Sequence, residues 1–491
     1  MKYLLGIDFG GSSAKATLLG TDGVIAAELS AEYPTYHPQS GFCEQRPDDW
    51  CRALITVIHG VLDAGKIDAR DILALSIDSA THTFLLTDGD HRPLYPAVHW
   101  TDSRAKEESR VLREQYGDEI FALTCHKPDT IWTMPQLLWM KNHLPSVFGA
   151  AKHLYFEKDH LRRFLTGVYV TDPIDAEGSM LYDMTSRVWS DALCGMIGLD
   201  KSILPPCRAS GEIVGSVTEA AASYTGLTAG TPVLCGTTDT VMEVFAAGAV
   251  NKGDMTVKLA TAGRICVITD KPYPDRDLVN YSHIIPGLWY PGAATKAAAS
   301  SLGWYRSTFG GTYAKIDEAA ETVSPGCDGL FFHPYINGEL TPYADPSLCG
   351  SFVGVRSMHT KAHFDRAVLE GVAFSLMHSL NKLDSLGLPH SGRATLIGGG
   401  AKSRLWGQIV ADALGLTLDV TVSSDSSLGS AMLAGLTTGV FSSPTDAVEQ
   451  CVRVKNTILP NRDNTEKYRA LFDEYVRIHD ALAPLYTARN T

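Results

Sequence analysis

Short apolar runs, each closed by a turn of small residues, recur along this chain. Residues 4–7 are apolar and end at Asp8, a glycine- and serine-rich turn follows, and residues 14–19 return to an apolar pattern. This arrangement predicts a strand, a tight turn and a second strand. Residues 72–77 predict a buried strand, whereas residues 47–61 carry apolar side chains at helical spacing. Strands that alternate with helices are typical of an α/β domain.

The second half of the chain repeats this pattern. Residues 255–268 again predict a strand, a small-residue turn and a strand, and residues 394–397 predict a strand that runs into three glycines. A Gly/Pro-punctuated loop is expected over residues 331–342, and an amphipathic helix over residues 365–376. One hairpin at the start and another near the midpoint indicate a duplicated α/β domain, in which the two hairpins face each other across an interdomain cleft.

The pattern is interrupted near residues 247–253, where glycines and an asparagine cluster. We therefore expect one domain over residues 1–247 and a second over residues 248–491, with packing of the last helix on the first domain left open. The length of 491 residues agrees with this division, because it is too long for one ordinary core.

The composition narrows the class of ligand. Hydrophobic residues make up 45% and charged residues 20% of the chain, as in ordinary globular proteins. A net charge of −13 disfavours a nucleic-acid or anionic-membrane partner. A small phosphorylated ligand is still compatible with this charge, because backbone N–H groups are sufficient to bind it.

The cysteines and the termini point to the cytoplasm. The 10 cysteines are scattered, and none forms a CxxC pair or a zinc-type set with histidine. Scattered thiols in a large chain fit a reducing compartment. The N-terminus has no basic segment, so no signal peptide is expected, and no apolar run is long enough for a membrane span.

The first hairpin carries the first candidate chemistry. Its turn is made of Gly10, Gly11, Ser12 and Ser13, whose small side chains let a ligand approach the backbone. Successive N–H groups at such a turn form a concavity for phosphate oxygens. Asp8 beside it is a candidate ligand of Mg²⁺. The alternative is an N-terminal hairpin with a plain glycine turn.

Two further polar segments follow strands. Asp239 lies between a predicted strand at residues 233–235 and a predicted helix at residues 240–250, where loops of open α/β sheets do chemistry; the alternative is a helix N-cap. Residues 100–104 combine Trp100 and Asp102 with an arginine, which suits a polar pocket or, equally, a helix start.

Neighbouring mechanisms are excluded by their missing motifs. Gly6 and Gly11 have the spacing of a Walker A motif, but Ser12 stands where its lysine is required. No GxGxxG follows a strand, and no GxSxG elbow is present. The remaining interpretation is ATP bound by facing hairpins, Mg²⁺ on Asp8, and a second carboxylate on the acceptor side.

Taken in order, the motifs resemble those of the FGGY carbohydrate kinases, within the sugar kinase, actin and Hsp70 superfamily, and among them the xylulokinases. The start of the chain resembles the family's first phosphate motif, and residues 398–412 resemble its adenosine motif. The resemblance implies two duplicated ribonuclease H-like domains of the actin, hexokinase and Hsp70 type. Further segments match the family's sugar side, its lysine–aspartate helix and its C-terminal signatures: residues 44–50, 81–83, 100–104, 157–167, 334–355 and 366–376.

The resemblance also implies roles for individual residues. Asp239 takes the position of the catalytic base and Asp8 that of the residue near Mg²⁺. Residues matched to the sugar side are Thr81, His82, Trp100, Asp102, Asp239 and Thr240. Residues matched to ATP binding are Gly10, Gly11, Ser12, Ser13, Lys15, Thr261, Gly263, Gly399, Gly400 and Ser403.

The implied activity is transfer of the γ-phosphate of ATP to a small sugar, with a ketopentose such as D-xylulose as acceptor. Two departures affect this expectation. The second phosphate motif, usually Gly-Thr-Ser-Gly, is Ala-Thr-Ala-Gly at residues 260–263, and Ala80 and Thr81 replace the xylulokinase Gln-Met. Ribulose, erythrulose or glycerol are alternative acceptors, and a non-catalytic nucleotide- or sugar-binding switch is the alternative class. A homodimer is an expectation from the family alone.

Overall fold

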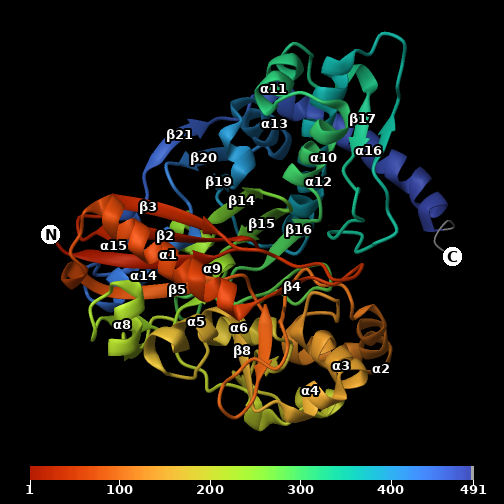
Figure 1. Cartoon of the computed structure of the whole chain (residues 1–491). Coiled ribbons are helices and arrows are strands. Elements are labelled where there is room, and N and C mark those ends of the chain that lie inside the picture. The colour runs from red at the N-terminus through yellow and green to blue at the C-terminus, as the bar shows by residue number, and fades with distance from the viewer. Residues whose placement is uncertain (488–491) are drawn as a thin grey trace. The chain divides into compact units, whose positions relative to one another are not determined.

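The computed structural model describes residues 1–487, which form two compact units by their internal contacts (Figure 1). Unit 1 consists of Met1–Gly248, Tyr281–Gly287 and Ser423–Val452. Unit 2 consists of Ala249–Asn280, Leu288–Val422 and the residues from Arg453 onward. Two segments of the second half of the chain therefore belong to unit 1. Among the described residues, no helix is long and apolar enough to cross a membrane.

The main sheet of unit 1 has the strand order β11-β12-β5-β1-β2-β3, and β13 pairs with β5 beside β12. β1 pairs in parallel with β5 and antiparallel with β2, and β2 pairs antiparallel with β3. A smaller sheet has the order β4-β7-β6-β8, and β9 pairs with β10. The strands are β1 (Tyr3–Phe9), β2 (Ser13–Gly20), β3 (Ile25–Glu32), β4 (Glu44–Gln45), β5 (Ile72–Ser79), β6 (Phe84–Thr87), β7 (Ala97–Val98), β8 (His153–Phe156), β9 (Tyr182–Asp183), β10 (Val188–Trp189), β11 (Ile213–Ser216), β12 (Pro232–Leu234) and β13 (Thr237–Thr238).

Helices pack against this sheet. The core of unit 1 is made of the apolar faces of β1, β2, β5 and α1, and it includes Trp50, Ile7 and Leu75. The helices of unit 1 are α1 (Pro47–Gly65), α2 (Lys106–Thr124), α3 (Thr133–His143), α4 (Pro145–Ala150), α5 (Glu157–Thr166), α6 (Pro173–Gly178), α7 (Asp191–Ile197), α8 (Glu219–Thr225), α9 (Asp239–Ala246), α14 (Ser426–Thr437) and α15 (Pro444–Cys451).

Unit 2 repeats the central arrangement of unit 1. Its sheet has the order β16-β15-β14-β19-β20-β21, so that an antiparallel hairpin again has a parallel strand beside its first strand. Its elements are β14 (Met255–Leu259), β15 (Gly263–Val267), β16 (Gly292–Thr295), α10 (Ala299–Phe309), α11 (Tyr313–Glu321), β17 (Phe331–His333), β18 (Ser351–Val353), α12 (Lys361–Ser385), β19 (Arg393–Ile397), α13 (Arg404–Leu414), β20 (Thr417–Thr421), β21 (Val454–Ile458) and α16 (Arg462–Thr487). The fold predicted from the sequence, two duplicated α/β domains, is confirmed.

Several predicted boundaries differ from the structure. The loop expected over residues 331–342 begins as a strand, because Phe331–His333 pair antiparallel with β18. The helix expected over residues 240–250 ends at Ala246, and Gly248 follows with a φ of 85°. The helix expected over residues 365–376 extends to Lys361–Ser385, and most of its length is buried. Tertiary pairing and burial decide these ends, which local periodicity does not specify.

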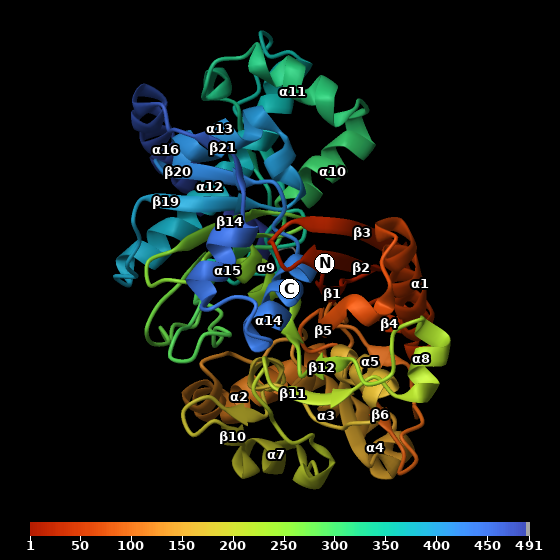
Figure 2. The same ribbon diagram turned by 90° about the vertical axis from the view of Figure 1, so that its left-hand side faces the viewer.

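Helix α14 belongs to unit 1 although it lies near the end of the sequence (Figure 2). It packs against β1 and α9, and the Ser427 hydroxyl shares a 2.7 Å hydrogen bond with that of Thr17. Its close approach depends on Gly6 of β1. A Cβ atom at Gly6 would lie 1.9 Å from the Ser427 carbonyl oxygen and 2.4 Å from the Ala431 nitrogen. Glycine is therefore required at this point for α14 to reach the sheet.

Replacing this glycine tests the packing of α14. We expect Gly6→Ala to destabilise the protein by about 3 kcal/mol, because backbone atoms of α14 must move away from β1. Gly117→Ala is the matched control, since Gly117 lies in α2 with no other heavy atom within 4 Å of its ideal Cβ; it should stabilise by about 0.5–1 kcal/mol. Denaturant midpoints measure both changes, and a wild-type midpoint for Gly6→Ala would contradict the packing described here.

Candidate active site

Two carboxylates meet where β1 and β5 end. The parallel register pairs Asp8 with Asp78, so both side chains lie at the same edge of the sheet. Oδ1 of each is buried and has no hydrogen-bond partner within residues 1–487, while Oδ2 of Asp78 accepts a hydrogen bond of 2.5 Å from Ser430 of α14. Burial raises the pKa of Asp8 to about 8, with the charges of Asp425 and Asp239 adding to it. Such a pair requires a proton or a cation.

Lys15 is the basic residue that pairs with Asp8 across strands β1 and β2. It lies opposite Asp8 on β2, and its Nζ is 3.0 Å from both Glu28 Oε1 and Asp425 Oδ2. Asp425 is the N-cap of α14. Lys15 thus links the first hairpin to α14 in this structure, and its contact with ATP stays a prediction.

Asp239 is the first residue of α9, directly after β13. The sequence predicted this strand-to-helix junction. The carboxylate is half-buried, and its hydrogen bonds within the described part of the chain all fall on Oδ1. The donors are the N–H of Thr240 at 2.6 Å, the Thr240 hydroxyl at 3.2 Å and the Thr81 hydroxyl at 3.4 Å. The helix start therefore holds the carboxylate in one orientation while Oδ2 keeps its capacity to accept a proton.

Thr81 and His82 follow β5 in a loop that faces Asp239. His82 adopts a φ of 52°, an uncommon conformation for a residue other than glycine. Two hydrogen bonds hold it there: its N–H donates to Asp175 Oδ1 at 2.9 Å, and its carbonyl accepts from the Thr133 hydroxyl at 3.2 Å. Its ring is buried and lies 5.1 Å from that of Trp132, between ring centroids.

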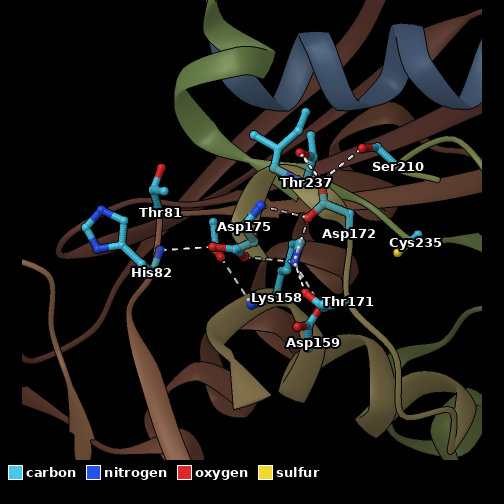
Figure 3. Close-up of polar contacts among 12 residues, drawn as sticks. Thr81, His82, Lys158, Asp159, Thr171, Asp172, Asp175, Ser210, Cys235 and Thr237 are labelled. Carbon is cyan, nitrogen blue, oxygen red and sulfur yellow. Dashed lines mark hydrogen bonds and ion pairs between the residues drawn. The ribbon is translucent and has the colours of Figure 1, made fainter. Parts of the chain in front are cut away.

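A fully buried ion cluster supports this loop (Figure 3). The Nζ of Lys158 lies 2.9 Å from Asp159, 3.1 Å from Asp172 and 2.8 Å from Asp175, and it donates to the Thr171 hydroxyl at 3.3 Å. Burial of an ammonium is unfavourable unless several acceptors surround it, as they do here. Lys158 and Asp159 come from the start of α5, whereas Asp172 and Asp175 come from the cap and first turn of α6.

The ion cluster connects two parts of the candidate site. On one side, Asp175 accepts the N–H of His82. On the other side, Asp172 Oδ2 accepts the hydroxyl of Thr237 at 2.7 Å, and Thr237 is two residues before Asp239. One buried ammonium thereby fixes both the histidine loop and the strand that precedes the aspartate (Figure 3).

Trp100 and Asp102 lie in the next loop and differ in exposure. Trp100 is 38% exposed, and its N–H donates to the Thr83 hydroxyl. Asp102 is fully buried; Arg104 donates to both of its oxygens, and the N–H of Cys43 donates to Oδ2 at 2.6 Å. These contacts give Asp102 a role in fixing the loop, and its contact with sugar stays a prediction.

The turn of the first hairpin directs its carbonyls into the protein. The Gly10 carbonyl accepts the Tyr33 hydroxyl, and the Gly11 carbonyl accepts Thr35 at 3.0 Å and Gln45 at 2.9 Å. Gly11 and Ser12 are themselves exposed, and Ser13 begins β2. An exposed turn of small residues leaves its backbone accessible to a phosphate group.

The predicted ATP residues of unit 2 take two different positions. Thr261 and Gly399 are exposed, and nothing lies within 4 Å of an ideal Cβ at Gly399. Gly263 and Gly400 are buried, and a Cβ at either would meet a neighbouring side-chain atom at 2.7 Å. Ser403 is the N-cap of α13 and accepts the N–H of Trp406 at 3.0 Å. The buried glycines permit close packing, and the exposed residues are the ones open to a ligand.

Several residues near the predicted site had no role in the sequence analysis. Asp78 lies beside Asp8 only because of the strand register, and His99 lies with Nε2 3.6 Å from an ideal Cβ at Gly11. Trp132 packs on His82 from a segment 50 residues later. The sequence signal for Asp78 was its place at the end of a buried strand, whereas His99 and Trp132 have no local signal of this kind.

The oxygen atoms of this edge suit a magnesium ion in part. The unpartnered, buried Oδ1 atoms of Asp8 and Asp78 are the hard ligands that Mg²⁺ prefers. Within residues 1–487, no group of three or more His, Cys, Asp or Glu side chains is arranged to hold a metal. An ion here would therefore need phosphate oxygens or water to complete its coordination.

The protonation state of His82 has a consequence for acid stability. Burial lowers the pKa of His82 to about 3, and the charges of His126 and His99 act in the same direction. Because an unfolded histidine titrates near about 6.5, the folded state binds fewer protons below that pH, and stability falls as the pH decreases toward 3. We expect His82→Asn, which tolerates a positive φ, to flatten this fall by about 1 kcal/mol per pH unit. Urea midpoints between pH 6.5 and 4.5 measure it.

The exposed His59 provides the control for this experiment, since His59→Asn should leave the acid sensitivity as in the wild type. Equal slopes for His82→Asn and the wild type would contradict a buried, neutral His82.

Comparisons with known proteins agree with this geometry. Residues 3–246 match the N-terminal domain and residues 256–438 the C-terminal domain of the FGGY family of carbohydrate kinases. The chain is 32% identical to the xylulose kinase of Bacillus subtilis over 99% of both chains, and 28% identical to a gluconokinase of the same organism over 99% of this chain and 97% of that one. The ligand-bound xylulose kinase of Lactobacillus acidophilus superposes with a TM-score of 0.93 at 25% identity, over 99% of this chain and all of the other. The chain therefore belongs to the FGGY carbohydrate kinases, enzymes that transfer a phosphoryl group to a sugar hydroxyl.

Proposed function

We propose that this kinase transfers the γ-phosphoryl group of ATP to a hydroxyl of a small neutral sugar, and that the acceptor is a ketopentose such as D-xylulose. The observation that carries the proposal is the position of Asp239, a half-buried carboxylate that shares one sheet edge with Asp8 and Asp78 and faces Thr81. An acceptor hydroxyl beside Thr81 would lie within reach of this carboxylate. The full-length similarity to xylulose kinases supports the same acceptor class.

In the proposed reaction Asp239 acts as the general base. A sugar hydroxyl is a weak nucleophile, and a carboxylate that accepts its proton during attack on phosphorus contributes typically ~10²–10⁴-fold to the rate. The two groups of Thr240 and the Thr81 hydroxyl donate to Oδ1, which orients the carboxylate and leaves Oδ2 for the proton. Thr81 and His82 are proposed to orient the sugar, together with Trp100, Asp102 and Thr240.

The nucleotide is proposed to bind through the glycine turns of both units. The exposed backbone of Gly11 and Ser12 in unit 1, and of Thr261 and Gly399 in unit 2, is accessible to phosphate and adenosine groups. A Mg²⁺ ion, when bound at Asp8 and Asp78, supplies charge neutralisation to the phosphate oxygens. A cytoplasmic setting is proposed as well, in keeping with ten cysteines that are all free thiols.

The charges around Thr81 and His82 favour a neutral acceptor over a sugar acid. Low pKa values, about 3 for His82 and about 4 for His99, keep both rings uncharged at neutral pH because burial disfavours the cation. The nearby cations have carboxylate partners: Arg104 pairs with Glu44 and Asp102, Lys158 with its three aspartates, and Arg187 with Glu177. A gluconate carboxylate would thus meet neutral rings and neutralised cations. Gluconate remains the second candidate because of the gluconokinase relative.

Substitution of the proposed base tests the reaction. We expect Asp239→Asn to lower kcat by about 10²- to 10⁴-fold with a small effect on the KM of either substrate, because an amide orients the sugar but accepts no proton. The assay is coupled ADP release with D-xylulose, D-ribulose, L-erythrulose, glycerol and gluconate as acceptors. Asp90→Asn, a change at an exposed aspartate of unit 1, is the matched control and should keep the wild-type rate.

Three outcomes would contradict the proposal. A wild-type rate for Asp239→Asn would exclude Asp239 as the base. Gluconate as the preferred acceptor would exclude the neutral-sugar assignment. ADP release that no acceptor stimulates would exclude the kinase reaction with these sugars and would favour a binding role.

A further inference from the structure

The segment Tyr281–Gly287 belongs to unit 1, although the residues on either side of it belong to unit 2. Its attachment is specific. The backbone N–H of Ser282 donates to Glu177 Oε2 at 2.8 Å, and the Ser282 hydroxyl donates to Oε1 of the same carboxylate. Arg187 Nη1 reaches the Ser282 hydroxyl at 2.8 Å and Glu177 Oε1 at 3.2 Å. Glu177 is fully buried, so these bonds are shielded from water and fix the segment in place.

Tyr281, the first residue of this segment, continues an aromatic wall that begins at His82. The ring of Trp132 lies 5.1 Å from that of His82 and 6.4 Å from that of Tyr281, between centroids. The ring of His126 lies 5.4 Å from Tyr281 and stacks on Trp132 at 4.4 Å. Tyr281 is only 4% exposed. The wall thus joins the second half of the chain to the loop that carries the predicted sugar residues.

Gly178, at the end of α6, shows where the Tyr281 hydroxyl lies. An ideal Cβ at Gly178 would be 2.8 Å from His82 Cδ2, 2.9 Å from Thr81 Cγ2 and 3.3 Å from Tyr281 Oη. Three side chains from distant parts of the sequence therefore converge on one glycine. The phenol oxygen of Tyr281 and the methyl group of Thr81 thus both lie beside Gly178, and the hydroxyl of the same threonine contacts Asp239.

We propose that Tyr281 is a specificity-determining residue of the sugar site: its hydroxyl hydrogen-bonds to one hydroxyl of the acceptor, and its ring forms part of the wall against the sugar carbons. This inference rests on the proposed function. A phenol both donates and accepts hydrogen bonds, which matches a neutral polyhydroxyl ligand, and its rigid ring offers apolar surface beside the polar tip. A site that hydrogen-bonds a hydroxyl binds an analogue that lacks this hydroxyl more weakly, because one hydrogen bond to the ligand is lost.

Tyr281→Phe is the direct test, with Tyr224→Phe as the control because Tyr224 is 60% exposed in unit 1. Calorimetry without ATP gives the Kd of the preferred acceptor, and steady-state assays give KM and kcat. We expect Tyr281→Phe to raise Kd and KM about tenfold, to leave kcat at saturating sugar within about twofold, and to leave the KM of ATP unchanged. The control variant should match the wild type in all four quantities.

Deoxy analogues of the preferred acceptor identify the hydroxyl. For one monodeoxy sugar, we expect the wild type and Tyr281→Phe to bind equally weakly, because the partner of the phenol is already missing. Every other deoxy sugar should retain the tenfold difference. A constant difference across all analogues would overturn the hydrogen bond to the sugar and leave Tyr281 with a packing role.

Gly178→Ala provides an independent variant. Its methyl group would press on Thr81, His82 and Tyr281, so we expect a rise of at least tenfold in the Kd of the sugar with normal binding of ATP. Equal Kd values for the wild type, Tyr281→Phe and Gly178→Ala would overturn the role of Tyr281 and would leave the proposed function intact. A wild-type protein that binds no neutral sugar would overturn the proposed function, and the two failures are therefore distinguishable.

Discussion

A buried ammonium with three carboxylates around it is the constraint that holds the His82 loop and the strand before Asp239. Lys158, Asp159, Asp172 and Asp175 are all removed from water, and each would be costly to bury alone. Because the cluster is satisfied only as a whole, it fixes the positions of α5 and α6 relative to each other. Asp175 and Asp172 each contact Lys158 with one oxygen, and with the other they accept the His82 N–H and the Thr237 hydroxyl respectively. The carboxylates that surround Lys158 thus also fix the loop at His82 and the strand at Thr237.

The register of β1 and β5 brings the carboxylates of the sheet edge together. The parallel pairing of β1 with β5 brings Asp8 next to Asp78, and β13 pairs with the end of β5 just before Asp239. Three carboxylates consequently gather at one sheet edge, where the pKa of Asp8 is raised by burial and by its acidic neighbours. An acidic edge of this kind attracts a cation, and this is why Mg²⁺ is proposed to bind there. The duplication supplies a second glycine hairpin in unit 2.

The proposed acceptor site has a strained backbone at His82 and uncharged histidine rings. His82 holds an uncommon backbone conformation between Asp175 and Thr133, and strained residues persist only where the surroundings fix them. The rings of His82 and His99 are uncharged at neutral pH, and the cations nearby have carboxylate partners. Sequence identity does not separate the two acceptor classes, since the xylulose kinase and the gluconokinase of Bacillus subtilis are 32% and 28% identical to this chain.

The sequence by itself determined the repeated strand–turn–strand pattern, the two α/β domains and the strand-to-helix junction at Asp239. These features depend on local periodicity and on glycines whose conformational freedom is a property of the residue alone. Tertiary structure decided the rest. The pairing of Asp8 with Asp78 follows from strand register. The bonds of Asp102 to Arg104 and Cys43 follow from the packing of a loop. The assignment of α14 and Tyr281–Gly287 to unit 1 follows from contacts between residues far apart in the chain. The contacts that hold α14 and Tyr281–Gly287 leave no periodic signal, because their partners, Ser427 with Thr17 and Ser282 with Glu177, are more than a hundred residues apart.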